Sequence, residues 1–265
     1  MRNLIIGFAF SILIAIAAYK KRSLSRSGAL AAALLGGLMY YFGGVLAAVL
    51  LVGFFISSSL LTFAKGDRKK DIEKYNEKGG RRDALQVFAN GGVGLLFAAL
   101  YYFTKNPAYI IGCAVSFGEA NADTWASEIG VLSKKTPISI LTGKRMERGM
   151  SGGVSFLGTL AALGGSAFIA LLFSLVYILI YGFDGKVLYR FIIILLFGFL
   201  GAVIDSVLGA SIQAQYYCQE ENTITEKKEF RGKPNKLIKG FALFNNDVVN
   251  ISSNILSSMM VFLII

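Results

Sequence analysis

The feature that most constrains this chain is a segment long enough to cross a bilayer that nevertheless carries acidic side chains. Residues 108–130 begin as an apolar run and end in SFGEANADTWASEIG, which contains Glu119, Asp123 and Glu128. Ionised groups in hydrocarbon are tolerated only where they face other protein or a water-filled cavity. These acids are therefore candidates for a functional role.

The polar residues of this segment fall on two sides of a helix. At 100° per residue, one stripe holds Ser116, Glu119, Asp123 and Ser127, and Asn121 and Glu128 lie roughly opposite. Neither polar face can be exposed to lipid. We therefore predict that the helix is central and surrounded by other helices, or that it breaks near residues 118–121 and presents backbone groups as well.

Composition identifies the class of protein. The 265 residues are 55% hydrophobic with a mean hydropathy of +0.60, which is typical of a polytopic membrane protein and too apolar for an ordinary soluble domain. Histidine is absent, and Cys113 and Cys218 have no metal-ligand spacing. This excludes histidine-based catalysis and supports neither a zinc site nor a disulfide framework. It leaves carboxylates that suit a hard cation such as Mg²⁺.

Hydropathy predicts an all-α fold, a single integral membrane domain over residues 1–265 with about eight spanning helices. The expected spans are 4–19, 28–42, 45–64, 84–103, 108–130, 153–181, 187–212 and 244–265.

The net charge of +11 is concentrated in particular loops. Segments 20–27, 65–83, 131–152 and 213–243 hold 23 of the 27 Lys and Arg residues. The positive-inside rule predicts that these basic loops are cytoplasmic and that both termini lie on the outer side of the membrane. The protein is therefore expected to be a multi-pass protein of the cell membrane. The charge is thus explained by topology, and no nucleic-acid-binding module accompanies it.

A cleavable signal peptide is the alternative for the first segment. Arg2 and the Ala15-Ile16-Ala17 run are compatible with one. The basic cluster at 20–22 suits an N-out first helix better.

Three further segments carry polar faces. Asp83, Gln86 and Asn90 share one face, and Asp205 lies among Gly198, Gly201 and Gly209. The last segment opens with Asn245-Asn246-Asp247 and carries a continuous polar stripe: Asn246, Asn250, Ser253, Asn254 and Ser257. We expect Glu119, Asp123, Asp205 and Asp247 to meet in one site. The alternative, open for Asn90 in particular, is a set of separate interhelical hydrogen bonds worth about 1 kcal/mol each.

A basic, glycine-rich turn follows the acidic segment. It contains Lys144, Arg145 and Arg148, then Gly149-Met150-Ser151-Gly152-Gly153. Cationic side chains and exposed backbone N–H groups at a helix start suit phosphate. Basic loops before membrane helices are also common topogenic features, and the turn does not match GxxxxGK[ST]. The acidic helix just upstream favours the phosphate interpretation.

Three motifs together suggest a family: residues 122–130 (ADTWASEIG), 149–155 (GMSGGVS) and 205–210 (DSVLGA). From about Ala84 to its end the chain resembles the membrane family that includes transmembrane protein 19 and plant phytyl-phosphate kinase. More distantly it resembles CTP-dependent polyprenol and phytol kinases and CDP-diacylglycerol synthases. The family usually has Gly-Thr where this chain has Gly149-Met150, so a hydroxyl is missing here.

The resemblance implies a multi-pass enzyme that uses Mg²⁺ and a nucleotide, with CTP favoured, on a prenyl-type lipid. We therefore hypothesise a kinase that converts a prenyl monophosphate, such as phytyl or geranylgeranyl phosphate, to the diphosphate. Its partners would be that lipid, the nucleoside triphosphate and the bilayer, with a second copy of the chain as a candidate partner and no nucleic acid. The rivals are cytidylyl transfer to a lipid phosphate, an ion-coupled transporter and a non-catalytic scaffold.

The hypothesis assigns a role to each candidate residue. Asp123 and Asp205 would hold Mg²⁺, with Glu119 or Asp247 as further ligands or bases. The expected phosphate-binding and orienting groups are Lys144, Arg145, Arg148, the turn residues Gly149, Ser151, Gly152 and Gly153, and the amides of Asn90, Asn121, Asn246 and Asn250.

The topology can be tested by labelling. In a chain without its two native cysteines, Lys144→Cys should react with a thiol reagent from the cytoplasmic side only, because its loop belongs to the basic set. Strong labelling of intact cells from outside would overturn the orientation and, with it, access of a cytosolic nucleotide.

Overall fold

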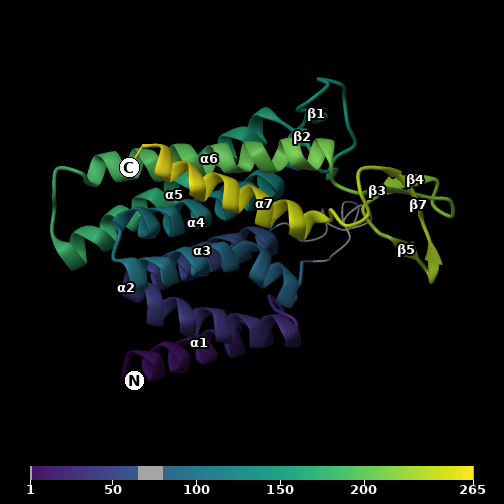
Figure 1. Ribbon diagram of the computed structural model, residues 1–265. Helices are drawn as coiled ribbons and strands as arrows, with labels where there is room; N and C mark the ends of the chain where they lie inside the picture. Colours follow the sequence, from purple (N-terminus) through teal and green to yellow (C-terminus); the bar gives the residue numbers. More distant parts are fainter. Residues whose placement is uncertain (1, 65–79, 265) are drawn as a thin grey trace.

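A bundle of helices forms the body of the protein, with a small β-structure at one end (Figure 1). The computed structural model describes residues 2–64 and 80–264. Its helices are α1 (Arg2–Lys20), α2 (Arg26–Ala64), α3 (Ala84–Thr104), α4 (Pro107–Gly130), α5 (Phe156–Tyr181), α6 (Val187–Ser211) and α7 (Asn246–Met259), with a 3₁₀ turn η2 (Met260–Leu263) after α7.

Helix α2 contains two of the predicted helices, 28–42 and 45–64. At Gly44 the backbone leaves helical geometry, with φ +64° and ψ −159°, a conformation that suits glycine. A side chain at Gly36 would reach within 3.9 Å of Leu51, so the two halves lie side by side. The chain therefore makes a helical hairpin at Gly44 (Figure 1).

The prediction that the acidic helix is central is confirmed. Helix α4 packs against α2, α3, α5, α6 and α7, and every residue from 110 to 122 is buried. It runs unbroken from its cap at Asn106, whose side chain accepts a hydrogen bond from the N–H of Ala108, to Gly130. The alternative of a break near residues 118–121 is wrong.

Small residues set the contacts of α4 with α5 and α6. A side chain at Gly165 would lie 2.8 Å from the carbonyl oxygen of Asn121, and one at Gly198 would lie 2.9 Å from the backbone of Gly118. The hydroxyl of Ser166 donates to the carbonyl of Leu195 at 2.9 Å, which joins α5 to α6. Such close backbone approach is the usual packing mode of helices in lipid.

Short strands occur in two of the predicted basic loops. β1 (Ile138–Ser139) pairs with β2 (Gly153–Val154). Further along, β4 (Thr223–Thr225), β3 (Gln215–Cys218) and β7 (Lys236–Lys239) form one antiparallel sheet in that order, and β5 (Glu229–Phe230) pairs with β6 (Lys233–Pro234). Loops 131–152 and 213–243 are thus folded, which the all-α prediction did not anticipate.

The described parts of the four basic segments lie at the same end of the bundle. Leu24 forms a bridge with Arg82, and Ser151 contacts Glu226 across the other two loops. Residues 65–79 of the second segment lie outside the described residues. This arrangement fits the predicted topology, while the side of the membrane remains a prediction.

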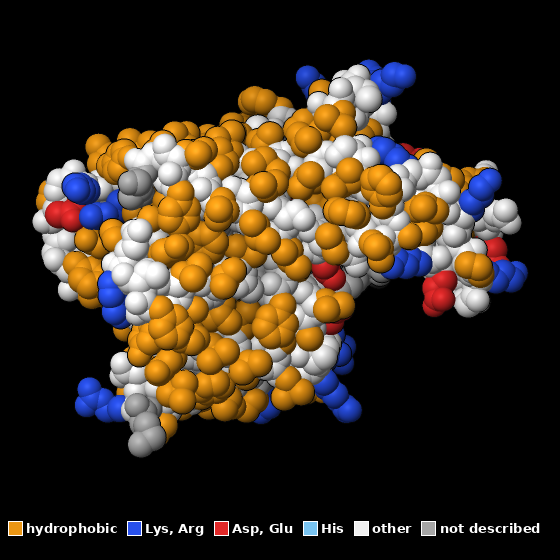
Figure 2. All heavy atoms as spheres, viewed as in Figure 1, with side chains coloured by type: hydrophobic (Ala, Val, Ile, Leu, Met, Phe, Trp, Pro, Cys, Tyr) orange, Lys and Arg blue, Asp and Glu red, His pale blue; other side chains and the backbone are white. Residues whose placement is uncertain are grey.

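The protein is a membrane protein by the character of its helices. Among the described residues, α1, α2, α3, α5 and α6 are long and apolar enough to cross a membrane. Helix α4, with its three acids, and α7, with 14 residues, are outside this set, and the count of eight spans stays a prediction. Figure 2 shows hydrophobic side chains over most of the visible face of the bundle.

The contact between α4 and α6 can be tested by adding one methyl group. Gly198→Ala should lower the free energy of unfolding by about 1–3 kcal/mol, because the new carbon overlaps Ser166 and the backbone of Gly118. Gly185→Ala is the matched control, since nothing lies within 4 Å of its added carbon. Thermal unfolding in detergent measures both, and equal melting temperatures would show that α4 and α6 separate at this point without cost.

Candidate functional site

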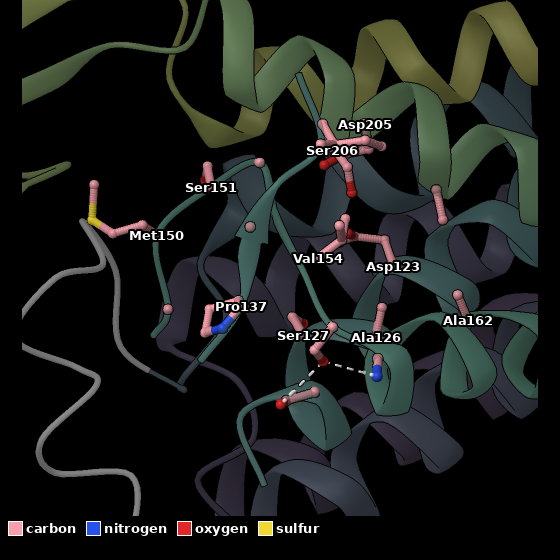
Figure 3. A pocket seen from close by; sticks show the side chains of 18 of the residues that line it. Asp123, Ala126, Ser127, Pro137, Met150, Ser151, Val154, Ala162, Asp205 and Ser206 are labelled. Atoms are coloured by element: carbon pink, nitrogen blue, oxygen red, sulfur yellow. Dashed lines mark hydrogen bonds between the residues drawn. The ribbon is translucent and has the colours of Figure 1, made fainter. Parts of the chain in front are cut away.

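A cavity of about 460 Å³ lies between α4, α5 and α6 at the loop-bearing end of the bundle (Figure 3). The turn at 148–155 covers it, and Gln86, Asn246 and Asp247 reach it from α3 and α7. Several predicted site residues line it: Asp123, Asp205, Asp247, Arg148, Gly149, Ser151, Gly152, Gly153 and Asn246. One cavity thus holds acids, a basic side chain and the glycine-rich turn.

Two carboxylates from different helices face this cavity. Asp123 belongs to α4 and Asp205 to α6, and their side chains reach into the same pocket (Figure 3). They lie within electrostatic range of one another, and Asp205 is 9% exposed. Asp247, in the first turn of α7, supplies a third carboxylate to the wall.

Glu119 lies behind the cavity, one helical turn deeper than Asp123. It is 1% exposed and accepts hydrogen bonds from the hydroxyl of Ser253, at 2.6 Å, and from the amide of Asn254. Gly201 makes room for it, because a side chain there would meet Glu119 and lie 2.8 Å from Ser257. The structure therefore gives Glu119 a position that joins α4 to α7, outside the cavity lining.

Ser253 links this buried acid to the cavity. Its hydroxyl is 2.6 Å from Glu119 Oε1 and 3.2 Å from Asp205 Oδ2. A hydroxyl has one proton, so it donates to one of the two carboxyls at a time. The two acids are thereby coupled through a single side chain.

The amide of Asn250 supports Asp205 from behind. With its nitrogen toward the acid, Asn250 donates to Asp205 Oδ2 and to the carbonyl of Asn246, both at 3.0 Å. In the opposite amide orientation it donates to Asn90 Oδ1 at 3.5 Å. Asn250 and Asn90 therefore lie beside the cavity acids and not in the lining, and Asn90 also donates to the carbonyl of Gln86 at 2.9 Å.

The glycine-rich turn packs directly on the end of α6. Gly149 and Gly152 have φ values of +87° and +83°, which favour glycine. A side chain at Gly152 would lie 2.5 Å from Ala210 Cα, so backbone meets backbone here. The turn thus lies directly on α6 at this point, and its residues line the cavity.

Glu226 is a site residue that the sequence analysis missed. It is 7% exposed, lies between β4 and β5, and lines the cavity. One of its oxygens accepts from both the N–H and the hydroxyl of Ser151, at 3.3 and 2.5 Å. No periodic pattern marks Glu226, because it lies in an irregular loop rich in basic residues.

Five of the expected binding residues are not in the cavity lining: Asn90 and Asn250, described above, and Lys144, Arg145 and Asn121. Lys144 and Arg145 are exposed beyond β1, in the segment that returns toward the turn. The amide of Asn121 accepts from Ser57 at 2.7 Å and donates to the carbonyl of Gly165 at 2.8 Å. Asn121 thus joins α2, α4 and α5, and its predicted substrate-orienting role does not fit this position.

The third of the predicted basic residues, Arg148, does line the cavity. Arg148 is exposed, and one of its N–H groups donates to the carbonyl of Lys134 at 3.0 Å. An arginine has further N–H donors in a planar fork that matches phosphate. Arg148 is therefore the predicted basic residue best placed to meet an anion in the cavity.

The acids fit a magnesium ion whose other ligands come from substrate. Within the part of the chain that the structure describes, no three His, Cys, Asp or Glu side chains form a metal-binding group. Mg²⁺ is commonly held by one or two carboxylates together with substrate phosphates and water. Asp123 and Asp205 supply that number of carboxylates on one cavity wall.

Comparison with known proteins identifies the family. The model of the integral membrane protein family DUF92 matches residues 9–258. The chain belongs to the DUF92 family. It is 32% identical to Protein PGR of Arabidopsis thaliana over 97% of this chain and 94% of that protein.

Two further proteins are similar to this chain. An uncharacterized membrane protein of Methanocaldococcus jannaschii is 31% identical over 83% of this chain and 87% of its own length. Protein VTE6, chloroplastic, of Arabidopsis thaliana is 29% identical over 56% of this chain and 46% of its own length. No solved structure matches the chain.

The contact of Glu226 with the turn can be tested by hydrogen exchange. Glu226→Ala removes the acceptor of the Ser151 N–H, so the amides of residues 149–153 should exchange faster, by about tenfold for a bond of about 1.4 kcal/mol. Glu229→Ala is the matched control, since that acid is exposed in β5 of the same loop. Unchanged exchange in Glu226→Ala would show that the turn keeps its shape without this acid.

Proposed function

We propose that this DUF92 protein is an integral membrane kinase that transfers a phosphoryl group from a nucleoside triphosphate, with CTP favoured, to a prenyl monophosphate. The observation that carries the proposal is the meeting of Asp123 and Asp205, from two helices, in one cavity with Arg148 and the glycine-rich turn. Phosphoryl transfer requires mainly positioning and charge stabilisation, and these groups can supply both.

The resemblance supports the choice of substrate. The run ADTWASEIG at residues 122–130 resembles the family that includes plant phytyl-phosphate kinase, and it contains Asp123. The similarity to Protein VTE6 covers about half of each polypeptide. The length of the prenyl chain, the nucleotide and the identity of the membrane are therefore parts of the proposal.

The reaction needs little acid–base chemistry. A phosphate oxygen of the prenyl monophosphate forms a bond to the γ-phosphorus, the bond from that phosphorus to the bridging oxygen breaks, and the nucleoside diphosphate leaves with the electron pair. The second pKa of a phosphate monoester is about 6, so the attacking oxygen is largely ionised at neutral pH. A site without histidine is compatible with this chemistry.

The chain's own residues would position the two phosphates. Asp123 and Asp205 would hold Mg²⁺, which when bound neutralises phosphate charge and orients the reacting oxygens. Arg148 and backbone N–H groups of the turn would contact phosphate oxygens at the loop side, other than those of Ser151 and Gly153, which donate to Glu226 and to the carbonyl of Met150. Asn250 and Ser253 would keep the Asp205 carboxylate turned toward the cavity.

Neutralising Asp123 tests the proposal directly. Asp123→Asn keeps the size and hydrogen bonding of the side chain but removes the charge, so turnover should fall by several orders of magnitude in protein that inserts and folds. Mg²⁺-dependent nucleotide binding should fall as well. Asp184→Asn is the control, because Asp184 lies between α5 and α6 at the other end of these helices, where it pairs with Arg190 at 2.9 Å.

The outcome that would contradict the site is equally specific. Near-normal turnover in correctly inserted Asp123→Asn would remove Asp123 from the metal and shift the role to Asp205 and Asp247. A more stable protein with normal turnover would show that Asp123 is only a structural partner, since burying an ion is costly.

The reaction type is decided by the nucleotide product. Purified protein is incubated with each nucleoside triphosphate, Mg²⁺ and a panel of prenyl phosphates, and lipid and nucleotide are analysed by mass spectrometry. The proposal requires a nucleoside diphosphate and a prenyl diphosphate. Release of pyrophosphate with a cytidylylated lipid would identify a cytidylyltransferase in its place.

A further inference from the structure

The cavity continues from the acids into a cleft between α5 and α6. The two helices touch where Ser166 donates to the carbonyls of Ile194 and Leu195. Nearer the loops both helices line the cavity, with Gly158, Thr159 and Ala162 from α5 and Phe199, Ala202, Val203 and Ser206 from α6. From Ser166 to Gly158 this is about 12 Å along the helix, at about 1.5 Å per residue.

The inner wall of this cleft is made by small side chains of α4. Ala126 lines it beside Asp123, and Ala122, Ala162 and Ala202 pack together where the three helices converge. Small residues at a meeting of three helices leave space that larger side chains would fill. Figure 3 places Met150 and Ser151 at one end of the pocket and Ala162 at the other.

The outer edge of the cleft faces hydrocarbon. Helices α5 and α6 are both apolar enough to span a membrane, and residues that flank the lining are exposed on them: Leu160, Leu163 and Leu200. Thr159 is also exposed while it lines the cavity. The described helices that pack on this pair are α4, α2 and α7.

We propose that this cleft is the tail-binding groove of the enzyme, and that the prenyl chain of the lipid substrate enters it sideways from the bilayer between α5 and α6. This inference rests on the proposed function. An occupant that comes from hydrocarbon must be apolar, and one that ends at Asp123 and Asp205 must carry a headgroup that binds a metal. A prenyl monophosphate has both properties in one molecule.

The width of the cleft argues against a protein occupant. A helix with side chains is about 10–12 Å across. Helices α5 and α6 remain in hydrogen-bonding contact at Ser166, so they cannot admit one between them. A single flexible hydrocarbon chain is the occupant whose thickness fits.

The first test is selectivity for chain length. Thr159→Phe places a ring at the mouth of the cleft, so the ratio of kcat/KM for geranylgeranyl phosphate to kcat/KM for a five-carbon monophosphate should fall about tenfold or more. Leu160→Phe is the matched control, because Leu160 is exposed beside Thr159 but does not line the cavity. An unchanged ratio in Thr159→Phe would overturn the groove.

The second test does not depend on turnover. A prenyl phosphate with a diazirine on its tail is photolysed in membranes that contain the wild-type protein without nucleotide, and the labelled peptides are mapped. Labels on the α5 segment around Thr159 and the α6 segment around Val203 support the groove. Labels confined to other helices, or no labels in protein that turns over, overturn it.

The two proposals fail separately. If the wild-type protein phosphorylates no prenyl phosphate but the tail still labels α5 and α6, the kinase reaction is wrong and the groove stands as a lipid site. If turnover is found and the tail labels α2 and α3, the reaction stands and the groove is wrong.

Discussion

The hydrogen bonds of the buried Glu119 carboxyl are the interaction on which the rest of the structure depends. Helix α7 has 14 residues and a polar stripe, so hydrophobicity alone does not hold it in the bundle. Ser253 and Asn254 donate to the two oxygens of Glu119, and Asn254 in turn accepts from Ser116. In a low dielectric such satisfied networks are strong, and a missing partner is costly. Glu119 therefore fixes where α7 meets α4, and α7 carries Asn250 and Ser253 to Asp205.

That placement brings several carboxyls close together. Asp123 lies within electrostatic range of both Glu119 and Asp205, and Glu226 is close enough to act on Asp205. Like charges at short distance in a poorly hydrated space repel strongly. A divalent cation held by Asp123 and Asp205 would relieve this repulsion, which is the physical reason why we propose a metal-dependent phosphate reaction in this cavity.

The sequence predicted which residues of the acidic segment share a face of the helix. It predicted the roles of individual residues less well. The 100° rule separated Glu119 and Asp123 from Asn121, and the contacts agree, since Asn121 faces Ser57 on α2 and Gly165 on α5. The assignment of Asn121 to the substrate rested on residue type, and the structure places its amide between α2 and α5, outside the cavity lining. Loops have no such periodicity. Nothing in the sequence predicts that β1 pairs with β2, which leaves Lys144 outside the cavity. Nothing in it predicts that Glu226 lies beside Ser151.

The contact between Glu226 and Ser151 constrains how phosphate could use the turn. A single carboxylate oxygen takes both donors of Ser151, which are the groups that a phosphate oxygen would use. An anion in the cavity must therefore bind other N–H groups of the turn, or Glu226 must release Ser151. In the second case phosphate binding would displace the loop between β4 and β5. The position of the sheet at residues 215–239 would then depend on whether the cavity is occupied. Gly152 packs directly on Ala210 of α6, so the turn has little room to move toward the anion. The segment that must move is therefore the loop that carries Glu226.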